Sequence, residues 1–465
     1  MNRKTSSIIA LAMTLSTTTF ALTLDEYMLV VKTKNKVFRA YEASLEASHS
    51  KFVAGDLTLS PVFTAGYSLA TDMSQPSTLG TKREIQEYSL GIAKKFSTGT
   101  AVSLSAQTDQ FKNETAAPSD QFSTGGLGIS LTQSLWKDFF GHGTRLRQQR
   151  ESLVNQFESL GIDLKLRATA FDAESAYWDY AFAQEDLKLK KENLDRAKKM
   201  EKWTSNRVSN GISDRADLMN VRALAALREV QFATAEDDLK TQEIRIREYL
   251  VLDETEKTPD VTADLVMARL DVAQLAKSNK DIVKIDLYLS SLEAQSKQMI
   301  ASEIKDSLRP DLSLVGSYGT TAYNREYSEV TANIADTDKP KTFIGLNFSW
   351  MFDTDAKTSQ LSAASKDALA SQYIAERNLV LGRIAWKELL RKYELTKKNI
   401  VTLEKVAQFQ RERAKAEQDK FNKGRTVTAN VVTAETDAAE AEVSLLRAKS
   451  GLRKLEASSL LFIAL

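Results

Sequence analysis

Few residues in the sequence could carry out chemistry. The chain has no cysteine and only two histidines, His49 and His142. Thiolate nucleophiles, disulfides, thiolate metal sites and a lipid anchor on an N-terminal cysteine are therefore not expected, nor is a metal-dependent or histidine-triad enzyme. The run Gly125-Gly126-Leu127-Gly128 precedes an alternating segment instead of a helix, so it does not fit a phosphate-binding loop. We expect no enzyme, no cofactor and no metal.

The charge balance excludes another class of function. The sequence holds 63 Lys+Arg and 62 Asp+Glu in 465 residues, which gives a formal net charge of +1. Because nucleic-acid binding depends on surplus cationic side chains, we expect no nucleic-acid partner. Apolar residues make up 42% of the chain, enough to bury a core or an assembly interface.

Proline spacing predicts long helices. No proline occurs from Ser119 to Thr258, and none follows Pro340. Proline costs about 3 kcal/mol inside a helix, so gaps rich in Ala, Leu, Glu, Lys and Gln permit long helices. Sparse apolar residues among charges indicate the narrow stripe of a coiled coil. The predicted helices cover 24–54, 144–208, 214–252, 271–307, 356–422 and 427–462.

Other segments alternate with period two. In one of them Ile344, Leu346 and Phe348 alternate with small or polar residues. This pattern predicts strands, and about ten residues of it is typical of strands with lipid on one side and water on the other. A half-buried sheet in a soluble protein has the same period. The aromatic residues predicted for the membrane interface are Trp136, Phe139, Trp350 and Phe352.

The chain divides into two similar halves. Leu59-Ser60-Pro61 matches Leu308-Arg309-Pro310, and each half reads as helix, two strands, long helix, turn and helix. The first repeat covers 22–252, a linker or equatorial segment covers 253–270, and the second repeat covers 271–465. Residues 84–110 are predicted to form an extra hairpin, which gives four strands in the first half and two in the second.

The first residues have the character of a secretory signal. Arg3 and Lys4 precede the apolar run Ile8–Met13, and Ala21 ends a threonine-rich stretch. We expect a cleaved signal peptide over residues 1–21. A short core helix is the alternative. No later stretch offers about 18 consecutive apolar residues, so no transmembrane helix is expected.

Four kinds of motif occur in order along the chain. They are the opening Leu22-Thr23-Leu24-Asp25-Glu26 with Asn35, the strand entries at Pro61 and Pro310, the strand exit Leu131-Thr132-Gln133-Ser134-Leu135-Trp136, and the turns Asn210-Gly211-Ile212 and Lys423-Gly424-Arg425. In these motifs the sequence resembles the outer-membrane efflux proteins of the TolC type, the exit ducts of tripartite efflux pumps and type I secretion systems. The similarity spans nearly the whole chain after residue 21.

The resemblance implies an α+β membrane protein of the Gram-negative outer membrane. Its fold class is a trimeric outer-membrane β-barrel continuous with a long α-helical coiled-coil tunnel in the periplasm. The implied partners are two further copies in a homotrimer, outer-membrane lipid, a periplasmic adaptor (membrane fusion) protein, and an inner-membrane transporter of the RND or ABC class. The sequence does not identify the cargo or the pump class.

The resemblance also assigns the turns and the residues that follow them. It implies that an adaptor docks at the tip residues Asn210, Gly211, Ile212, Lys423, Gly424 and Arg425. The family closes its periplasmic end with polar links and acidic rings, and the matching gate and pore candidates are Asp217, Arg425, Asn430 and Thr433. The usual acidic ring positions are Asn430 and Thr433, so the charged ring is lost. A link between Asp217 and Arg425 or two solvated side chains both fit, and Asn430 also fits an ordinary helix residue.

Two alternatives stay open from sequence. The hairpin 84–110 is predicted to enter the barrel wall, and an extracellular cap is the alternative. Three copies of six strands give about 18, within the range of porins. The alternative to a duct is a periplasmic coiled-coil structural or adaptor protein without a pore.

Overall fold

The structure is a computed structural model. It describes residues 22–72, 82–113, 120–253, 255–261, 265, 272 and 281–465. The predicted signal peptide 1–21 and part of the predicted linker 253–270 lie outside these residues. The chain divides into two compact units, each described by itself below. The helical unit comprises the described residues of Met1–Ala43, Asp163–Ile285 and Arg383–Leu465, and the sheet unit comprises those of Ser44–Ile162 and Asp286–Gly382.

The first predicted helix is two helices. Helix α1 spans Leu24–Lys34 and α2 spans Lys36–Gly55, with Asn35 between them in an extended conformation. The side-chain oxygen of Asn35 accepts a hydrogen bond from the backbone N–H of Val37 at 2.9 Å. Asparagine interrupts helices in this way because its side chain satisfies a free amide at the start of the next helix. The prediction of one continuous helix over 24–54 is therefore wrong at Asn35.

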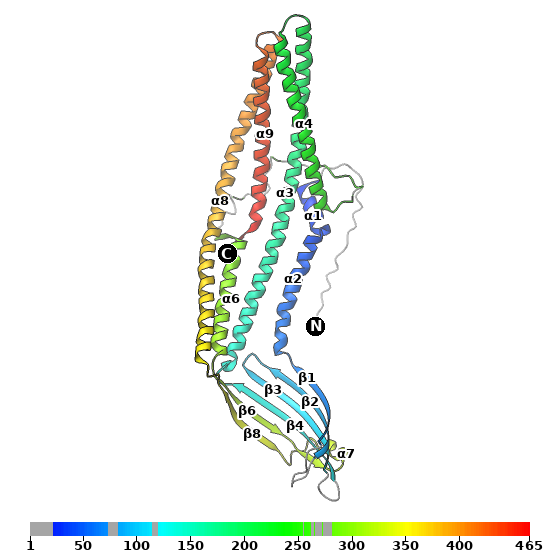
Figure 1. Ribbon diagram of the computed structural model, residues 1–465, viewed down its shortest axis with the longest axis vertical. Helices are drawn as coiled ribbons and strands as arrows, with labels where there is room; N and C mark the ends of the chain where they lie inside the picture. Colours follow the sequence, from blue (N-terminus) through cyan, green and yellow to red (C-terminus); the bar gives the residue numbers. More distant parts are fainter. Residues whose placement is uncertain are drawn as a thin grey trace. The chain divides into compact units, whose positions relative to one another are not determined.

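The long helices agree with the proline spacing (Figure 1). Helix α3 spans His142–Ser209, α4 spans Arg215–Leu250, α8 spans Thr354–Asn422 and α9 spans Thr428–Ser458. Helices α3 and α8 contain 68 and 69 residues. Helices α2, α3 and α8 contribute residues to both units. None of the helices within the described ranges is long and apolar enough to cross a lipid bilayer.

The predicted helices over 271–307 and 427–462 both include residues that form strands, and residues 271 and 273–280 lie outside the described part of the chain. Helix α6 begins only at Ile285 and ends at Ser307, whereas Ile282–Lys284 form strand β5. Helix α9 ends at Ser458, a short 3-10 turn follows, and Phe462–Ala464 form strand β9, which pairs antiparallel with β5. Both strands are rich in β-branched and aromatic residues, which favour extended pairing over a helix end.

The core of the helical unit joins its first helix to the long helices. Tyr27 and Val31 of α1 are fully buried with Tyr177 of α3 and Ile246 of α4. The Tyr27 hydroxyl donates a hydrogen bond to the carbonyl of Ala173 at 3.1 Å, and the Tyr177 hydroxyl donates one to the carbonyl of Leu22 at 2.9 Å. Each buried hydroxyl thus has the partner that burial demands.

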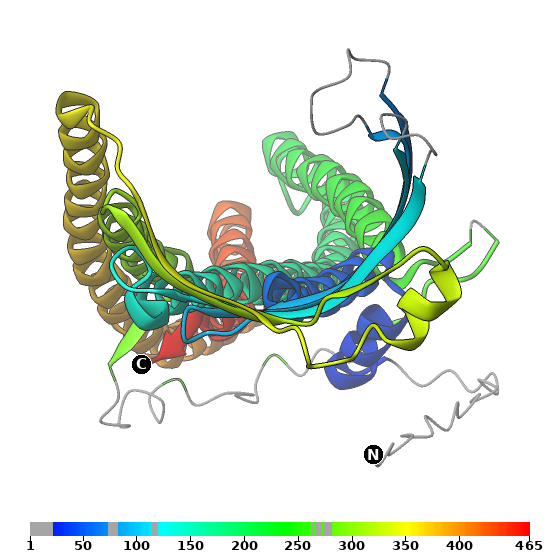
Figure 2. The same cartoon turned by 90° about the horizontal axis from the view of Figure 1, so that it is seen from below.

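The sheet unit contains one antiparallel sheet with the strand order β1-β2-β3-β4-β6-β8. Its long strands are β1 Val62–Thr71, β2 Lys82–Lys95, β3 Thr100–Asn113, β4 Asp120–Ser134, β6 Asp311–Gly319 and β8 Lys341–Ser349. The extra hairpin corresponds to β2 and β3, which pair with each other and lie between β1 and β4. The hairpin is therefore part of the sheet and does not project from it as a cap. Figure 2 shows that the sheet is strongly curved.

A short segment after β6 was not anticipated. Strand β7, Ala322–Asn324, pairs with β4 beyond the end of β6, and helix α7, Tyr327–Ala332, follows it. The sequence of this segment, Tyr327-Ser328-Glu329-Val330-Thr331-Ala332, is too short to show a helical period.

The exit from β4 into α3 is packed against the β2–β3 turn. Asp138 accepts hydrogen bonds from the backbone N–H of Thr144 at 2.8 Å and from the Lys95 ammonium at 2.9 Å. Gly99 and Gly141 both have positive φ. A Cβ atom on Gly141 would lie 1.8 Å from the carbonyl oxygen of Ser97, so only glycine fits.

We predict that Gly141→Ala destabilises the protein by about 3 kcal/mol, because the methyl group collides with backbone and the positive φ is strained. The matched control is Gly161→Ala in the interior of α3, where a Cβ atom meets nothing within 4 Å. This control should gain roughly 0.5–1 kcal/mol. Denaturant unfolding of the two purified variants measures both values. A Gly141→Ala protein as stable as the wild type would contradict the packing at this junction.

Candidate functional site

One face of the sheet is apolar across its strands. Phe63 pairs with Ile92, Ile92 with Leu104, and Leu104 with Ile129, which itself pairs with Tyr318. Paired residues of antiparallel strands point to the same face, so these five side chains form one row. On the same face β8 adds its own apolar residues, which are Ile344, Leu346 and Phe348. All of these side chains are exposed, and Ile344 is 83% exposed.

The opposite face carries mostly small and polar residues, although Phe111, Phe122 and Phe343 also lie on it. Gly66 pairs with Ser89, Thr64 with Gly91, and Ser105 with Gly128. A Cβ atom on Gly66 would lie only 2.7 Å from the Ser89 hydroxyl oxygen, and Gly91 and Gly128 are similarly crowded by their partners. Side chains converge on the concave side of a curved sheet, so this crowding indicates that the polar face is concave.

Helix α7 lies on the apolar face near one end of the sheet. Its Val330 is buried, and a Cβ atom on Gly125 would lie 2.7 Å from a methyl carbon of Val330. The Tyr327 hydroxyl is 3.1 Å from the hydroxyl of Thr108, which pairs with Gly125 and with Tyr88. Figure 2 shows α7 on the convex side of the sheet, which agrees with a convex apolar face.

The aromatic residues predicted for the interface gather where strands end. Strands β2, β4 and β8 run in the same direction, so their last residues lie at the same end of the sheet. Trp136 and Phe139 follow β4, and Trp350 and Phe352 follow β8 with their rings 4.9 Å apart. All four are exposed. Phe96 was not among the predicted aromatic residues, but it is exposed directly after β2 and lies at the same end of the sheet. Its position after a period-two segment could have indicated it.

The two helical turns have the same geometry. Gly211 and Gly424 have φ values of 70° and 72°, as the prediction of a glycine C-cap requires. The N–H of Ile212 bonds to the carbonyl of Arg207, and the N–H of Arg425 bonds to the carbonyl of Lys420, five residues back in both cases. This is the Schellman pattern, formed twice. Both turns lie at the same end of the helical unit (Figure 1), and a Cβ atom on either glycine would meet open space.

The gate candidates have partners within their own hairpins. The Asp217 carboxylate accepts a hydrogen bond from the Ser213 hydroxyl at 2.8 Å, and the structure records no contact with Arg425. Within this chain the suggested link between Asp217 and Arg425 is therefore not formed. Asn430 donates to the Thr426 hydroxyl at 3.1 Å, and the Thr433 hydroxyl donates to the carbonyl of Ala429 at 3.0 Å.

A link missed by sequence reasoning lies beside these residues. The Thr426 hydroxyl donates a hydrogen bond to Glu417 of α8 at 3.0 Å, and the Lys420 ammonium lies 2.7 Å from the same carboxylate. The hydrogen bond from Lys420, and to a smaller extent the one from Thr426, lowers the pKa of Glu417 below its ordinary value. The carboxylate is charged at neutral pH, and its hydrogen bond with Thr426 connects the turn to α8.

An apolar cluster joins the two hairpins near their turns. Phe421 of α8 is almost fully buried with Met200 of α3, Val221 of α4 and Val431 of α9. Its ring lies 4.5 Å from the ring of Trp203. The Arg207 guanidinium lies 4.6 Å from the Trp203 ring and 5.7 Å from the Phe421 ring. Phe421 therefore holds this end of the two hairpins together through apolar and aromatic contacts.

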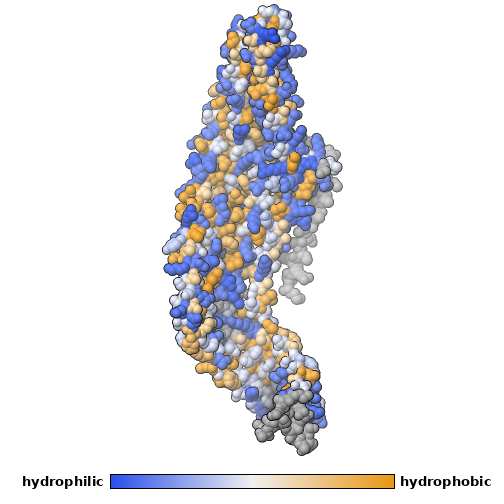
Figure 3. Space-filling view, viewed as in Figure 1, coloured by the Kyte–Doolittle hydropathy of each residue, from blue (hydrophilic) through white to orange (hydrophobic). Residues whose placement is uncertain are grey.

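The surface of the hairpins is mixed. Figure 3 shows hydrophilic and hydrophobic side chains interspersed along the helical unit. The exposed apolar residues of the long helices are scattered, and they include Val230, Ile244, Leu395 and Phe409. Single exposed apolar residues of this kind are ordinary on a protein surface, unlike the continuous apolar face of the sheet.

Comparisons with known proteins identify the fold. No protein-family model matches the sequence, and no curated protein matches it significantly. Among solved structures, the outer-membrane channel OprN matches with a TM-score of 0.65 and 17% identity, over 93% of this chain and 88% of that chain. The outer-membrane protein VceC of Vibrio cholerae matches with a TM-score of 0.65 and 12% identity, over 93% of this chain and 94% of that chain.

A third structure agrees with these two. The CmeC outer-membrane channel of Campylobacter jejuni matches with a TM-score of 0.60 and 12% identity, over 93% of this chain and 84% of that chain. The chain thus has the fold of outer-membrane channel proteins. The resemblance to the TolC type that the motifs indicated is confirmed by these matches.

We predict that Phe421→Ala loosens the turn end of the helical unit. Removing a buried phenylalanine costs about 3–5 kcal/mol, and Trp203 and Arg207 lose their common partner. Amide hydrogen exchange read by mass spectrometry should quicken in peptides from both hairpin ends. The control is Phe409→Ala on the same helix, where the side chain is 64% exposed. Equal exchange in the two variants would show that the cluster does not join the hairpins.

Proposed function

We propose that the chain is the outer-membrane exit duct of a tripartite efflux or type I secretion system. One observation carries the proposal: the sheet exposes a continuous apolar face on one side, and the residues of its other face are mostly small or polar. Burying apolar surface is worth roughly 25 cal/mol per Å², so a face of this extent requires an apolar environment. Lipid on the convex side and water on the concave side meet the needs of both faces.

The proposed assembly is a homotrimer. Among the described strands β1 pairs only with β2 and β8 only with β6, so the sheet has two open edges. Because β1 and β8 run in opposite directions, β8 of one copy can pair antiparallel with β1 of the next. Six long strands per copy give about 18 in three copies, enough to enclose a water-filled pore. The hairpin of β2 and β3 then lies in the barrel wall.

The long helices form the periplasmic part in this proposal. Helices α3 and α8 each reach about 100 Å at 1.5 Å per residue, far more than a compact domain needs. Three copies would join their coiled coils into a tunnel continuous with the barrel. The duplication of 22–252 in 271–465 belongs to this proposal, as does export to the outer membrane by a cleaved signal peptide without a lipid anchor.

Transport through this duct is passive in our proposal. An inner-membrane RND or ABC transporter supplies the energy, and a periplasmic adaptor hands over the cargo. The adaptor docks at the turns of residues 210–212 and 423–425, whose exposed Ile212 and positive-φ glycines present a fixed backbone shape. Asp217, Arg425, Asn430 and Thr433 lie beside these turns and line the gate. The match with channel proteins supports transport over catalysis.

The alternative is a periplasmic coiled-coil structural or adaptor protein without a pore. The helical unit alone would suit that function. The exposed apolar face, with aromatic residues at one end of its strands, does not suit a soluble structural or adaptor protein, because a sheet with such a face would aggregate in water.

A pair of neighbouring substitutions in β3 tests the duct. Leu104 is on the apolar face and Ser103 is on the polar face, so each variant adds an arginine to one side of the sheet. Leu104→Arg should cost about 2–4 kcal/mol in the bilayer and lower the amount of protein in the outer-membrane fraction. Ser103→Arg should reach the membrane at the wild-type level and reduce cation conductance in planar bilayers.

The outcomes of this pair separate the two functions. A wild-type protein that inserts but conducts no ions would refute the duct. Equal membrane levels of Leu104→Arg and the wild type would refute the placement of lipid on the apolar face.

We predict that Gly211→Val combined with Gly424→Val abolishes export while the amount of assembled protein in the outer membrane stays unchanged. Valine is strained at positive φ, so both turns lose the shape that the adaptor would recognise. Export is measured as the accumulation of a fluorescent efflux probe in cells. Gly451→Val is the control, because this glycine lies inside α9 with no atom within 4 Å of its Cβ position. Unchanged export in the double variant would remove the turns from the docking site.

A further inference from the structure

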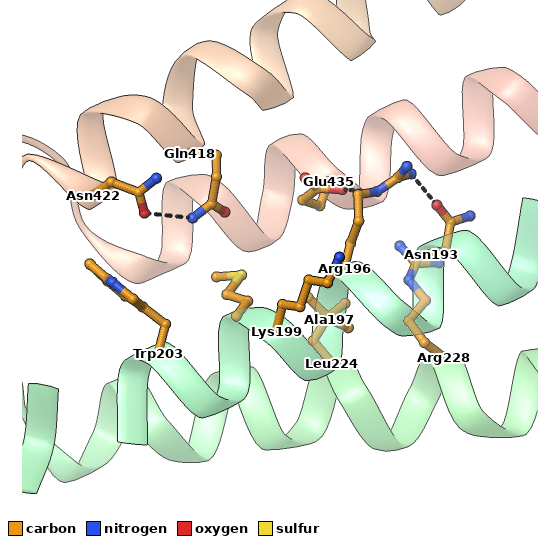
Figure 4. A pocket seen from close by; sticks show the side chains of 11 residues that line it. Asn193, Arg196, Ala197, Lys199, Trp203, Leu224, Arg228, Gln418, Asn422 and Glu435 are labelled. Carbon is orange, nitrogen blue, oxygen red and sulfur yellow. Dashed lines mark hydrogen bonds and ion pairs between the residues drawn. The ribbon is translucent and has the colours of Figure 1, made fainter. Parts of the chain in front are cut away.

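A cavity lies among the four long helices of the helical unit. Its volume is about 280 Å³, and residues of α3, α4, α8 and α9 line it. Figure 4 shows Trp203 at one end of this cavity, and Arg196, Arg228 and Asn193 toward the other. This volume is close to the lower end of the range of about 300–1,000 Å³ that is typical of small-molecule sites.

One part of the lining is apolar. Trp203, Leu224, Ala197 and Met200 contribute to it, and the last three are buried. The packing of Trp203 against Phe421 and Arg207 fixes the orientation of its ring. A rigid aromatic ring beside aliphatic side chains favours a flat, apolar ligand body.

The other part of the lining has a buried positive charge that forms no ion pair with the described residues. Arg228 is only 4% exposed. Its guanidinium donates hydrogen bonds to Gln231 at 2.7 Å and to Thr436 at 3.5 Å, both of which are neutral. No carboxylate among the described residues forms an ion pair with Arg228, and burial lowers the pKa of this arginine although Glu435 and Glu440 oppose the change. A buried charge without an opposite charge is costly, so the site favours an anion.

The nearby charges strengthen this preference. Glu435, the one carboxylate among the described lining residues, pairs with Arg196 at 3.1 Å and not with Arg228. Lys199 adds a third cationic group at the exposed margin. Asn193 is 4% exposed, and its amide nitrogen has no hydrogen-bond partner within the described part of the chain. An unsatisfied donor and a guanidinium without an ion pair in one lining are groups that a carboxylate could satisfy.

We propose that this cavity binds a small organic carboxylate, whose apolar body lies against Trp203 and Leu224 and whose carboxylate pairs with Arg228. A neutral analogue of the same shape gains the apolar contacts alone and leaves the guanidinium without a counterion. The lining comes from both hairpins, so an occupant bridges α3 and α4 to α8 and α9. The inference does not depend on the proposed function of the whole protein.

The test compares two probes of the same shape on the full-length protein in detergent. Isothermal titration calorimetry measures the binding of 1-naphthoate and of the neutral 1-naphthylmethanol. The wild type should bind naphthoate about tenfold more tightly than the alcohol, and added salt should reduce the difference. Naphthoate should also raise the thermal unfolding temperature, because it joins the two hairpins. Equal affinity for the two probes, or no binding of naphthoate, would overturn the proposal.

Variants assign the binding to this cavity. Arg228→Met should lower the naphthoate affinity about tenfold, to the level of the alcohol. Arg222→Met is the matched control on the same helix, because Arg222 is half-exposed, pairs with Glu201 and does not line the cavity. A naphthoate preference that survives Arg228→Met would overturn the proposal.

A milder variant covers the case in which Arg228→Met does not fold. Lys199→Gln removes an exposed charge from the margin and should leave the fold intact. A loss of about twofold or more in naphthoate affinity supports the proposal, and an unchanged affinity overturns it.

Discussion

The structure depends on the solvation of a sheet with two unlike faces. Antiparallel sheets usually bury one face against other elements and expose the other to water. Here the convex face is apolar, and its side chains are exposed from Phe63 in β1 to Phe348 in β8. The strand register, the glycine and serine pairs on the concave face and the aromatic residues at the strand ends all serve this single division.

The helical unit meets a different requirement with simpler means. Its hairpins are held by small buried residues such as Ala434 and Ala438 and by a few aromatic contacts, rather than by one large core. Small residues let helix axes approach closely over many turns. The same Schellman turn, formed at Gly211 and at Gly424, then reverses both hairpins at one end. Packing of this kind spreads stability along the hairpins, so local changes near the turns need not unfold the remainder.

Periodicity and proline spacing predicted the elements that repeat over many residues. The strands and the long helices agree within a few positions because each is encoded by a regular pattern. The misses depend on single residues or on distant partners. Asn35 breaks a helix through one side-chain hydrogen bond, β5 needs β9 from the other end of the chain, and α7 is held by Thr108 and Gly125. The turns at Gly211 and Gly424 were predicted from local sequence. The cavity beside Arg228 is lined by four helices that are distant in sequence, so no local pattern encodes it.

The unpaired edges of strands β1 and β8 have a consequence for folding and assembly. Each edge presents a row of backbone amide and carbonyl groups that have no strand partner in the described part of the chain, next to the apolar face. That combination seeds aggregates in water. A monomer in water would therefore need a chaperone that covers both rows. In the proposed trimer these rows would pair with those of the other copies, so assembly would depend on the protein concentration as well as on the stability of each copy.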